Sequence, residues 1–444
     1  MTTEAATLPA EQVDAPRKAG KNWSLVSRIS FRFAFCYWLL YCLPEQGRQS
    51  LMGLIPGAYF INRPYVGVWH KFTPWVARHF FHLSGTRITY VPTGSGDTTL
   101  DYVQNFLFVA LAVLAALVWS LLDRKREQYG TLYVWLRILL RFTLAITLFE
   151  YGLAKIVPLQ FRPPNLSQLV EGYGESSPMH LLWTFMGASM AYTIFAGLAE
   201  TTAATLLLFR RTALLGTLVA AGVLLNIVML NFCYDVPVKL YSANLLLMAL
   251  FLLLPDISRL ANVLILNRTV SPADLTKPHF SKRWMRVSAK AVTLALFAYF
   301  VASTTWGGWQ YFQRLKADGT PPIYGNYDVD ALSLNGKPAS LTDAAKPAWK
   351  QVIADYGSWV IQSTDGAQPI FAPHFEKGNT VYLYSWKTRS YIKLNYAQSD
   401  AQHLVLTGHL GDDSLEVRLH RTTKGKFLLT RRGFHWISEY PFNR

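Results

Sequence analysis

Charged residues are scarce in this sequence, and their scarcity excludes an ordinary soluble protein. Only 16% of the 444 residues are Asp, Glu, Lys or Arg, whereas 51% are hydrophobic. A typical soluble domain has about a quarter charged residues, so this chain lacks the polar side chains to coat one soluble globule. A disordered chain is excluded as well, because 63 aromatic residues (14 Trp, 23 Tyr and 26 Phe) favour burial over solvation.

Acidic residues are also few, and the resulting positive charge is unevenly distributed. The chain has 43 Lys and Arg against 27 Asp and Glu, which gives a formal net charge of +16. Residues 318–444 contain 14 basic and 12 acidic residues, so residues 1–317 contain the remaining 29 and 15. Positive charge that accompanies hydrophobic sequence indicates a membrane protein with basic cytoplasmic loops, and it makes nucleic acid a poor candidate partner.

Cysteine is nearly absent, which limits the thiol and metal chemistry open to the chain. The three cysteines are Cys36, Cys42 and Cys233. None of them forms a CxxC pair, a CxxCH haem-attachment motif or a zinc-binding spacing. We therefore predict inert thiols and neither a thiol relay nor a metal centre.

Long apolar stretches, by contrast, are abundant. Seven of them approach the length of about 20 residues that a helix needs to cross a bilayer: 29–44, 103–122, 132–154, 180–209, 212–232, 239–256 and 287–306. Basic residues gather in alternate short loops, after residue 122 and at Arg210 and Arg211. Since short basic loops stay in the cytoplasm, we expect a multi-pass protein of the inner (plasma) membrane with a cytoplasmic N-terminus and an extracytoplasmic C-terminal domain.

The predicted fold is an α-helical membrane bundle of about seven spans, followed by a small antiparallel all-β domain with one helix. We divide the chain into five segments. They are a cytoplasmic tail (1–28), two spans with a long outer loop (29–131), a four-helix membrane core (132–256), a basic inner loop with the last span (257–317) and an extracytoplasmic β module (318–444).

Two motifs in the long outer loop have alternative interpretations. Residues 68–83 combine aromatic residues with His and Lys, which is typical of a helix lying at the membrane interface, although His79 and His82 could also bind a metal or haem. The turn GSGDTT at 94–99 precedes the second span. Its Asp and Thr residues predict a helix N-cap, with a ligand-binding turn as the alternative.

The C-terminal segment alternates apolar and polar residues in short runs separated by turn residues, which predicts an antiparallel meander that closes into a barrel or sandwich. The runs are 358–364, 380–386, 390–396, 403–410, 414–421 and 426–432. Residues 341–357 predict the one amphipathic helix. No nucleophile or acid–base pair stands out, so this module is expected to bind or dock a periplasmic or secreted protein.

Ionisable residues within apolar spans are costly and mark candidate sites. Counting from the helix ends places Arg141 and Glu200 at similar depth, which predicts a structural ion pair, with Arg137 as the alternative partner. A second layer at the outer face would either bind a quinone headgroup, small anion or lipid headgroup, or form a hydrogen-bonded collar. It comprises Glu150, Tyr151, Lys155, His180, Asn226, Asn231, Asp235 and Lys239.

The middle of the chain, residues 132–256, resembles the DoxX family. The similarity is carried by EYGLAK at 150–155 and AGLAE at 196–200, and only Gly152, Lys155, Gly197 and Glu200 match the family motifs. The segment 231–239, the 94–99 turn and the ending FHWISEYPFNR resemble a larger subgroup with a C-terminal β module. The chain is also distantly similar to the membrane domain of vitamin K-dependent carboxylases.

The DoxX resemblance implies a four-helix membrane core and membrane redox work. Its relatives include a thiosulfate:quinone oxidoreductase subunit and partners of a sulfurtransferase and a superoxide dismutase. A quinone is the cofactor that this resemblance implies. Because the sequence has no redox cysteine pair or haem motif, the electron carrier would belong to another component of the assembly.

Three functions remain open from the sequence. The first is a membrane component of a redox or quinone-linked assembly that holds a headgroup or small ligand in the outer polar layer. The second is a carboxylase-like membrane enzyme with Lys155 as the general base and Glu150 as a further catalytic candidate. The third is a non-catalytic scaffold that docks a secreted partner through its β module.

Overall fold

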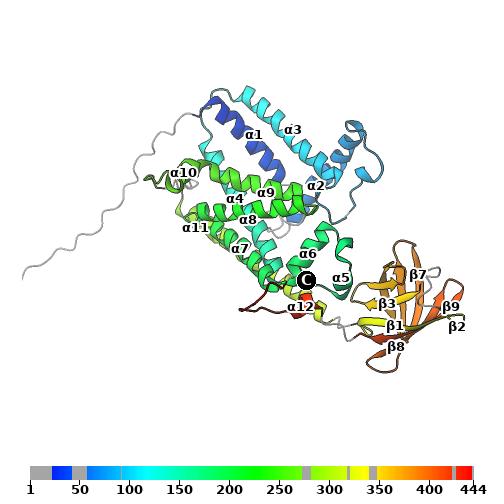
Figure 1. Ribbon diagram of the computed structural model, residues 1–444. Helices are drawn as coiled ribbons and strands as arrows, with labels where there is room; N and C mark the ends of the chain where they lie inside the picture. Colours follow the sequence, from blue (N-terminus) through cyan, green and yellow to red (C-terminus); the bar gives the residue numbers. More distant parts are fainter. Residues whose placement is uncertain are drawn as a thin grey trace, which may run out of the picture. The chain divides into compact units, whose positions relative to one another are not determined.

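The computed structural model describes residues 23–42, 58–91, 93–272, 282–317, 321–339, 348–422 and 427–442. The chain forms two compact units. The first contains Met1–Glu150, Thr202–Asn231 and Pro237–Phe300, and the second contains Tyr151–Thr201, Phe232–Val236 and Val301–Arg444. Most of the chain before residue 318 is helical, and the remainder is mainly β-structure (Figure 1).

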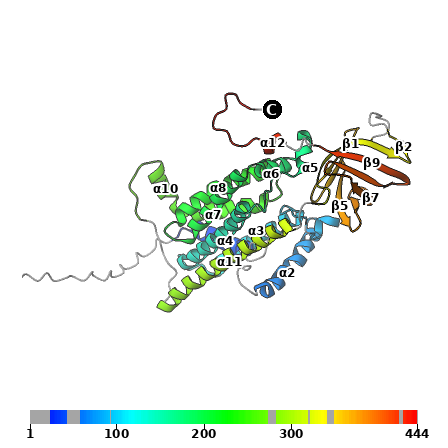
Figure 2. The same ribbon diagram turned by 90° about the horizontal axis from the view of Figure 1, so that it is seen from below.

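Most of the helices follow the apolar stretches of the sequence, whereas α2 Ala58–His79, α5 Leu166–Val170 and α10 Ile257–Leu264 lie outside them. The helices that follow them are α1 Leu25–Cys42, α3 Thr99–Leu122, α4 Gly130–Ile156, α6 Pro178–Ala188, α7 Met190–Leu208, α8 Ala213–Cys233, α9 Lys239–Leu253 and α11 Arg283–Ala317. The last of these is continuous over 35 residues (Figure 2).

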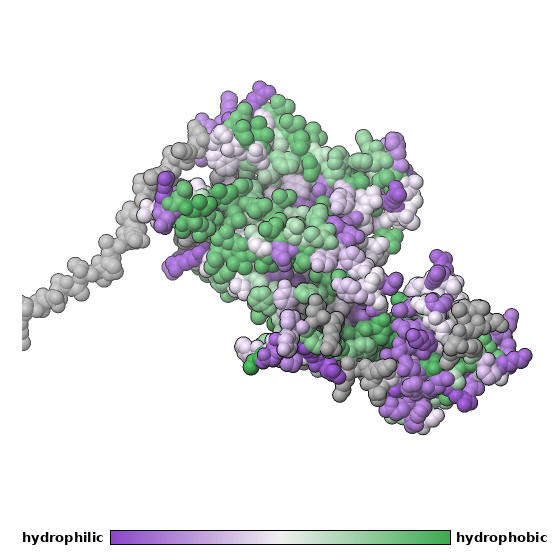
Figure 3. Space-filling view, viewed as in Figure 1, coloured by the Kyte–Doolittle hydropathy of each residue, from purple (hydrophilic) through white to green (hydrophobic). Residues whose placement is uncertain are grey.

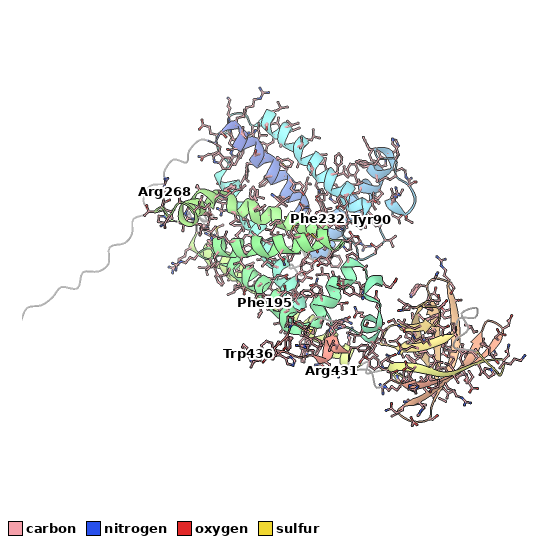
Figure 4. The ribbon with its side chains drawn as sticks, in the orientation of Figure 1. Tyr90, Phe195, Phe232, Arg268, Arg431 and Trp436 are labelled. Atoms are coloured by element: carbon pink, nitrogen blue, oxygen red, sulfur yellow. The ribbon has the colours of Figure 1, made fainter. Side chains whose placement is uncertain are left out.

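Five helical stretches of the described chain are long and apolar enough to cross a membrane: Thr99–Leu122, Gly130–Ile156, Met190–Leu208, Ala213–Cys233 and Lys239–Leu264. Many of their large apolar side chains face outward, as Figure 3 shows for the helical surface and Figure 4 for Phe195 and Phe232. Such an exterior suits lipid. The prediction of several long apolar helices is therefore confirmed, whereas the count of seven spans stays a prediction.

One predicted span is wrong as a single helix. Residues 180–209 are divided into α6 and α7 at Ser189, whose backbone is extended (φ −125°, ψ 94°). The Ser189 hydroxyl accepts a hydrogen bond from the Tyr192 amide, and the Thr193 hydroxyl donates to the Met186 carbonyl. These side chains satisfy backbone groups at the new helix ends, which allows the chain to break there.

The core of the first unit combines buried side chains of α1, α2, α3, α4, α7, α8 and α9. Trp69 of α2 and Tyr41 of α1 both approach the ring of Phe108, with centroid distances of 4.9 and 6.4 Å. The same helix exposes Phe72 and Trp75. Within the interfacial helix predicted at 68–83, Trp69 and Val76 are instead buried.

The second unit contains the β domain, whose strands pair in the order β2-β1-β3-β4-β5-β6-β7-β8-β9, with β1 also paired to β9. This extra pairing closes β1 and β3–β9 into an eight-stranded antiparallel barrel (Figure 1). The strands are β1 Gly325–Leu334, β2 Lys337–Pro338, β3 Trp349–Ala354, β4 Trp359–Ser363, β5 Ile370–Glu376, β6 Thr380–Ser385, β7 Ser390–Gln398, β8 His403–Leu410 and β9 Asp413–Arg421.

The barrel confirms the predicted antiparallel β domain but corrects two local assignments. The helix predicted at 341–357 is wrong for Trp349–Ala354, which form strand β3, while residues 340–347 lie outside the described chain. The strand predicted at 426–432 is wrong because Leu428–Arg431 form the short helix α12. Strand β3 is held by ladders to both β1 and β4, so tertiary pairing outweighs local helix propensity.

Candidate functional site

Helices α4 and α7 approach each other closely at two glycines, Gly152 and Gly197. A Cβ on Gly152 would lie 2.6 Å from a methyl carbon of Thr201, and one on Gly197 would lie 2.9 Å from Cβ of Lys155. Small residues allow such backbone contact between apolar helices. The crossing brings the last turn of α4 beside the middle of α7.

A buried ion pair lies at this crossing. Nζ of Lys155 donates to a carboxylate oxygen of Glu200 at 2.9 Å, and the residues are 7% and 2% exposed. The ammonium also lies 3.4 Å from the Tyr151 carbonyl oxygen. In an apolar helical setting, each charge offsets much of the cost of burying the other.

The predicted ion pair between Arg141 and Glu200 is therefore wrong. Lys155, the actual partner of Glu200, lies 14 residues after Arg141 on the same continuous helix, which is about 21 Å along its axis. The predicted pairing assumed that the spans 132–154 and 180–209 are single helices aligned from end to end, so that residues at equal distances from their ends lie at equal depth in the membrane. Instead, α7 begins at Met190 and crosses α4 near its C-terminal end.

Aromatic rings border the ammonium group. Nζ of Lys155 lies 5.5 Å from the ring centroid of Tyr151 and 5.8 Å from that of Phe161, within the range of a cation–π contact. Phe161 is buried and packs edge-on against Trp183 of α6 at 5.1 Å. The sequence predicts Tyr151 at a site but gives no signal for Phe161, because Phe161 lies in the irregular segment after α4.

The segment that carries Phe161 is fixed against α6 by another glycine. A Cβ on Gly187 would lie only 2.0 Å from the carbonyl oxygen of Arg162, so the two backbones touch. This contact explains why a glycine stands near the end of α6. It holds the chain after α4 in place and thereby positions Phe161 beside the ion pair.

Among the other residues of the predicted outer layer, Asn231 and His180 have partners in their own units. Asn231 donates to the Ser242 hydroxyl at 3.0 Å, and Nε2 of His180 lies 3.0 Å from a Glu171 oxygen. Asn226 is exposed on α8. Asp235 adopts a positive φ of 51° in the turn after α8.

The turn at 94–99 caps two helices. Thr98 and Asp101 form a capping box at the start of α3, which confirms the predicted N-cap. Asp97 accepts hydrogen bonds from the backbone amides of Lys239 and Leu240 at 2.8 and 2.9 Å, at the start of α9. The Lys239 ammonium is 3.9 Å from the same carboxylate. The second cap joins segments far apart in sequence, so no local pattern could reveal it.

Metal ligation finds no support in the part of the chain that the structure describes. Its His, Cys, Asp and Glu side chains form no group of three that could hold a metal ion. His79 instead stacks on Trp75 at 4.8 Å, and its Nδ1 lies 2.8 Å from the Trp75 carbonyl oxygen. The clearest candidate site is therefore the Lys155–Glu200 pair with its aromatic border.

Comparison with known proteins identifies a relative in Bacillus subtilis (strain 168), described as the uncharacterized protein YwoB. It is 41% identical over 118 residues, which are 26% of this chain and 73% of the relative. The chain therefore belongs to the same family as YwoB. No family model matches the chain. No solved structure matches it either.

Proposed function

We propose that this member of the YwoB family is a multi-pass protein of the inner (plasma) membrane that binds the polar headgroup of a lipid-soluble ligand at Lys155 and Glu200. It would serve as the membrane component of a DoxX-like, quinone-linked assembly, with electron transfer assigned to a partner. The seven-span topology and the extracytoplasmic β domain form part of the same proposal. The observation that carries it is the buried ion pair at 2.9 Å between apolar helices.

The chemistry of the pair suits a ligand with a carbonyl or anionic oxygen. An ammonium group has three donors, and in the structure Glu200 and the Tyr151 carbonyl oxygen occupy two of them. A headgroup oxygen could take another donor while Glu200 keeps the charge balanced. The rings of Tyr151 and Phe161 would contact the flat, apolar part of a quinone.

A purely structural role explains the pair less well. Replacing a buried ion pair with packed apolar residues is often neutral or stabilising, so stability alone gives little reason to place one here. Ionisable residues inside a membrane are by default candidate functional groups. The four residues that carry the DoxX resemblance also lie together: Gly152 contacts Gly197, and Lys155 pairs with Glu200.

The carboxylase-like alternative uses the same lysine differently. A general base needs a nitrogen that is free to face the substrate, whereas Nζ of Lys155 is already held between Glu200 and the Tyr151 carbonyl oxygen. The 2.9 Å contact with Glu200 therefore favours binding over proton abstraction at Lys155.

Co-purification of a ligand tests the proposal. The full chain and its Lys155→Met and Glu200→Gln variants would be purified in mild detergent, extracted with organic solvent and analysed by mass spectrometry. We expect a quinone with the wild-type protein and a strong reduction in Lys155→Met. Absence of any quinone from the wild-type extract, or equal amounts from all three proteins, contradicts the proposal.

The scaffold function is favoured by one separate observation. The C-terminal tail exposes large apolar side chains, with Trp436 91%, Tyr440 84% and Phe434 78% exposed. Trp436 and the nearby Arg431 are labelled in Figure 4. Complementation distinguishes the two functions. A scaffold loses its phenotype when residues 318–444 are deleted but keeps it in Lys155→Met, whereas a binding protein loses it in Lys155→Met and keeps part of it in the deletion.

A further inference from the structure

Three arginines in the first unit form a basic cluster, which we define as Arg137, Arg141 and Arg210. The first two lie four residues apart on α4 and so share one helix face. Arg210 lies in the turn between α7 and α8. The positive charges of Arg137 and Arg210 both act on Arg141, which places each of them within electrostatic range of Arg141.

This cluster has no acidic partner in the described chain. The ion pairs found there leave all three guanidinium groups without a carboxylate. Arginine keeps its charge in proteins, so the cluster cannot relieve its repulsion by losing a proton. A bound anion would neutralise this positive charge.

The unsatisfied hydrogen-bond donors of the cluster also favour binding of an anion. Nε of Arg141 and Nη1 of Arg210 are buried and donate to no acceptor. A buried donor on a charged group is costly to leave unsatisfied. Aromatic rings orient two of the guanidinium groups, with Arg137 5.7 Å from the Tyr133 ring and Arg141 5.2 Å from the Phe142 ring. These oriented, unsatisfied donors are what an incoming oxyanion requires.

We propose that the basic cluster binds a phosphate group, supplied by the headgroup of an anionic phospholipid or by free phosphate. Guanidinium forks match phosphate oxygens in paired hydrogen bonds. Basic pockets between helices on the cytoplasmic side are a known type of site for anionic headgroups. Arg137 lies about 10 Å and Arg141 about 16 Å from the start of α4, so their long side chains can reach the headgroup boundary.

This site is distinct from the Lys155–Glu200 pair and does not depend on the function proposed for it. Arg141 and Lys155 are about 21 Å apart along α4. A quinone has no phosphate group, so the ligand proposed for the Lys155–Glu200 pair differs from the ligand proposed for the basic cluster. Because the two sites share no residue, either one can be present without the other.

Lipid retention and thermal stability test the proposal on the full chain in detergent. Dioleoylphosphatidylglycerol, dioleoylphosphatidylcholine and inorganic phosphate would be added separately, with bound lipid counted by native mass spectrometry. The variants are Arg141→Gln, Arg210→Gln and, as a matched control, the exposed neighbour Arg211→Gln. Arg141→Lys keeps the positive charge but removes the paired N–H donors of the guanidinium group. This variant replaces Arg141→Gln in the experiment if the Gln variant does not fold.

We expect phosphatidylglycerol to stabilise the wild-type protein, with affinity lowered about tenfold or more in Arg141→Gln and Arg210→Gln and unchanged in Arg211→Gln. Stabilisation by inorganic phosphate as well, with the same loss in both variants, would support the phosphate site and assign it to a free anion. Stabilisation by neither, or equal stabilisation of wild type and both variants, would overturn the proposal.

Discussion

Gly152 and Gly197 lie against each other's backbone. A Cβ on Gly152 would be 2.8 Å from the carbonyl oxygen of Gly197, and a Cβ on Gly197 would be 2.6 Å from that of Gly152. Three residues along each helix, Lys155 and Glu200 form their ion pair. The contact between the two glycines thus sets the distance at which the charges meet.

Substitution of either glycine by alanine should separate the helices. We expect Gly197→Ala to lower the free energy of unfolding by about 1–3 kcal/mol, since a side chain forced into a packed interface moves the backbone. Reversible unfolding in mixed detergent micelles measures it. The matched control is Gly222→Ala in α8, where an added Cβ meets nothing within 4 Å; equal destabilisation by both changes would refute the close crossing.

Removal of one charge should cost more than removal of both. Lys155→Met leaves Glu200 as an uncompensated buried charge, and the expected loss of stability is about 3–5 kcal/mol. The double variant Lys155→Met with Glu200→Leu should recover most of that loss, because neither charge remains. Unfolding free energies of the two single variants and the double variant form the test, and simple additivity would show that the residues do not interact.

The cap that Asp97 gives to α9 should act through the backbone amides and not through the Lys239 ammonium. Asp97→Ala removes two hydrogen bonds at the start of α9, and we expect it to lower the unfolding free energy by about 1–2 kcal/mol. Lys239→Met should change it by less than about 0.5 kcal/mol. The reverse order of the two effects would assign the stabilisation to the ion pair.

In the β domain, hydrogen bonds hold the pKa of the Asp400 carboxyl below its ordinary value of 3.8. The largest contribution comes from the His403 side chain, followed by the amides of Gln402 and His403. The stabilisation is therefore present above the unfolded pKa of about 3.9 and is lost as pH falls through the lower folded value. Melting curves at acidic pH should show a steeper loss for wild type than for Asp400→Asn, and parallel curves would contradict this.

Periodicity explains how far the fold could be predicted from the sequence. Val381 and Leu383 of β6 point into the barrel while their neighbours do not, so the period of two identified the strand. Residues 349–354 mix Lys and Gln with apolar residues and fit a helix or a strand equally well. Only their pairing with β1 and β4 makes them a strand, and that pairing joins distant residues.

The candidate site was predictable in its residues but not in its pairing. Lys155 and Glu200 stood out because ionisable groups are rare in apolar spans. Their pairing depends on where α4 and α7 cross, and the break at Ser189 shifts the start of α7. Phe161 lies outside any periodic segment, so only the folded chain shows that it borders the ammonium.

The central claim, that Lys155 and Glu200 bind a headgroup, is tested most directly by titrating the full chain in detergent with ubiquinone-1, a short-chain quinone. Melting temperature would be followed for wild type, Lys155→Met and Lys239→Met. We expect a saturable rise in melting temperature for wild type and Lys239→Met and no rise for Lys155→Met. An unchanged melting temperature for wild type, or an equal rise in Lys155→Met, would contradict it.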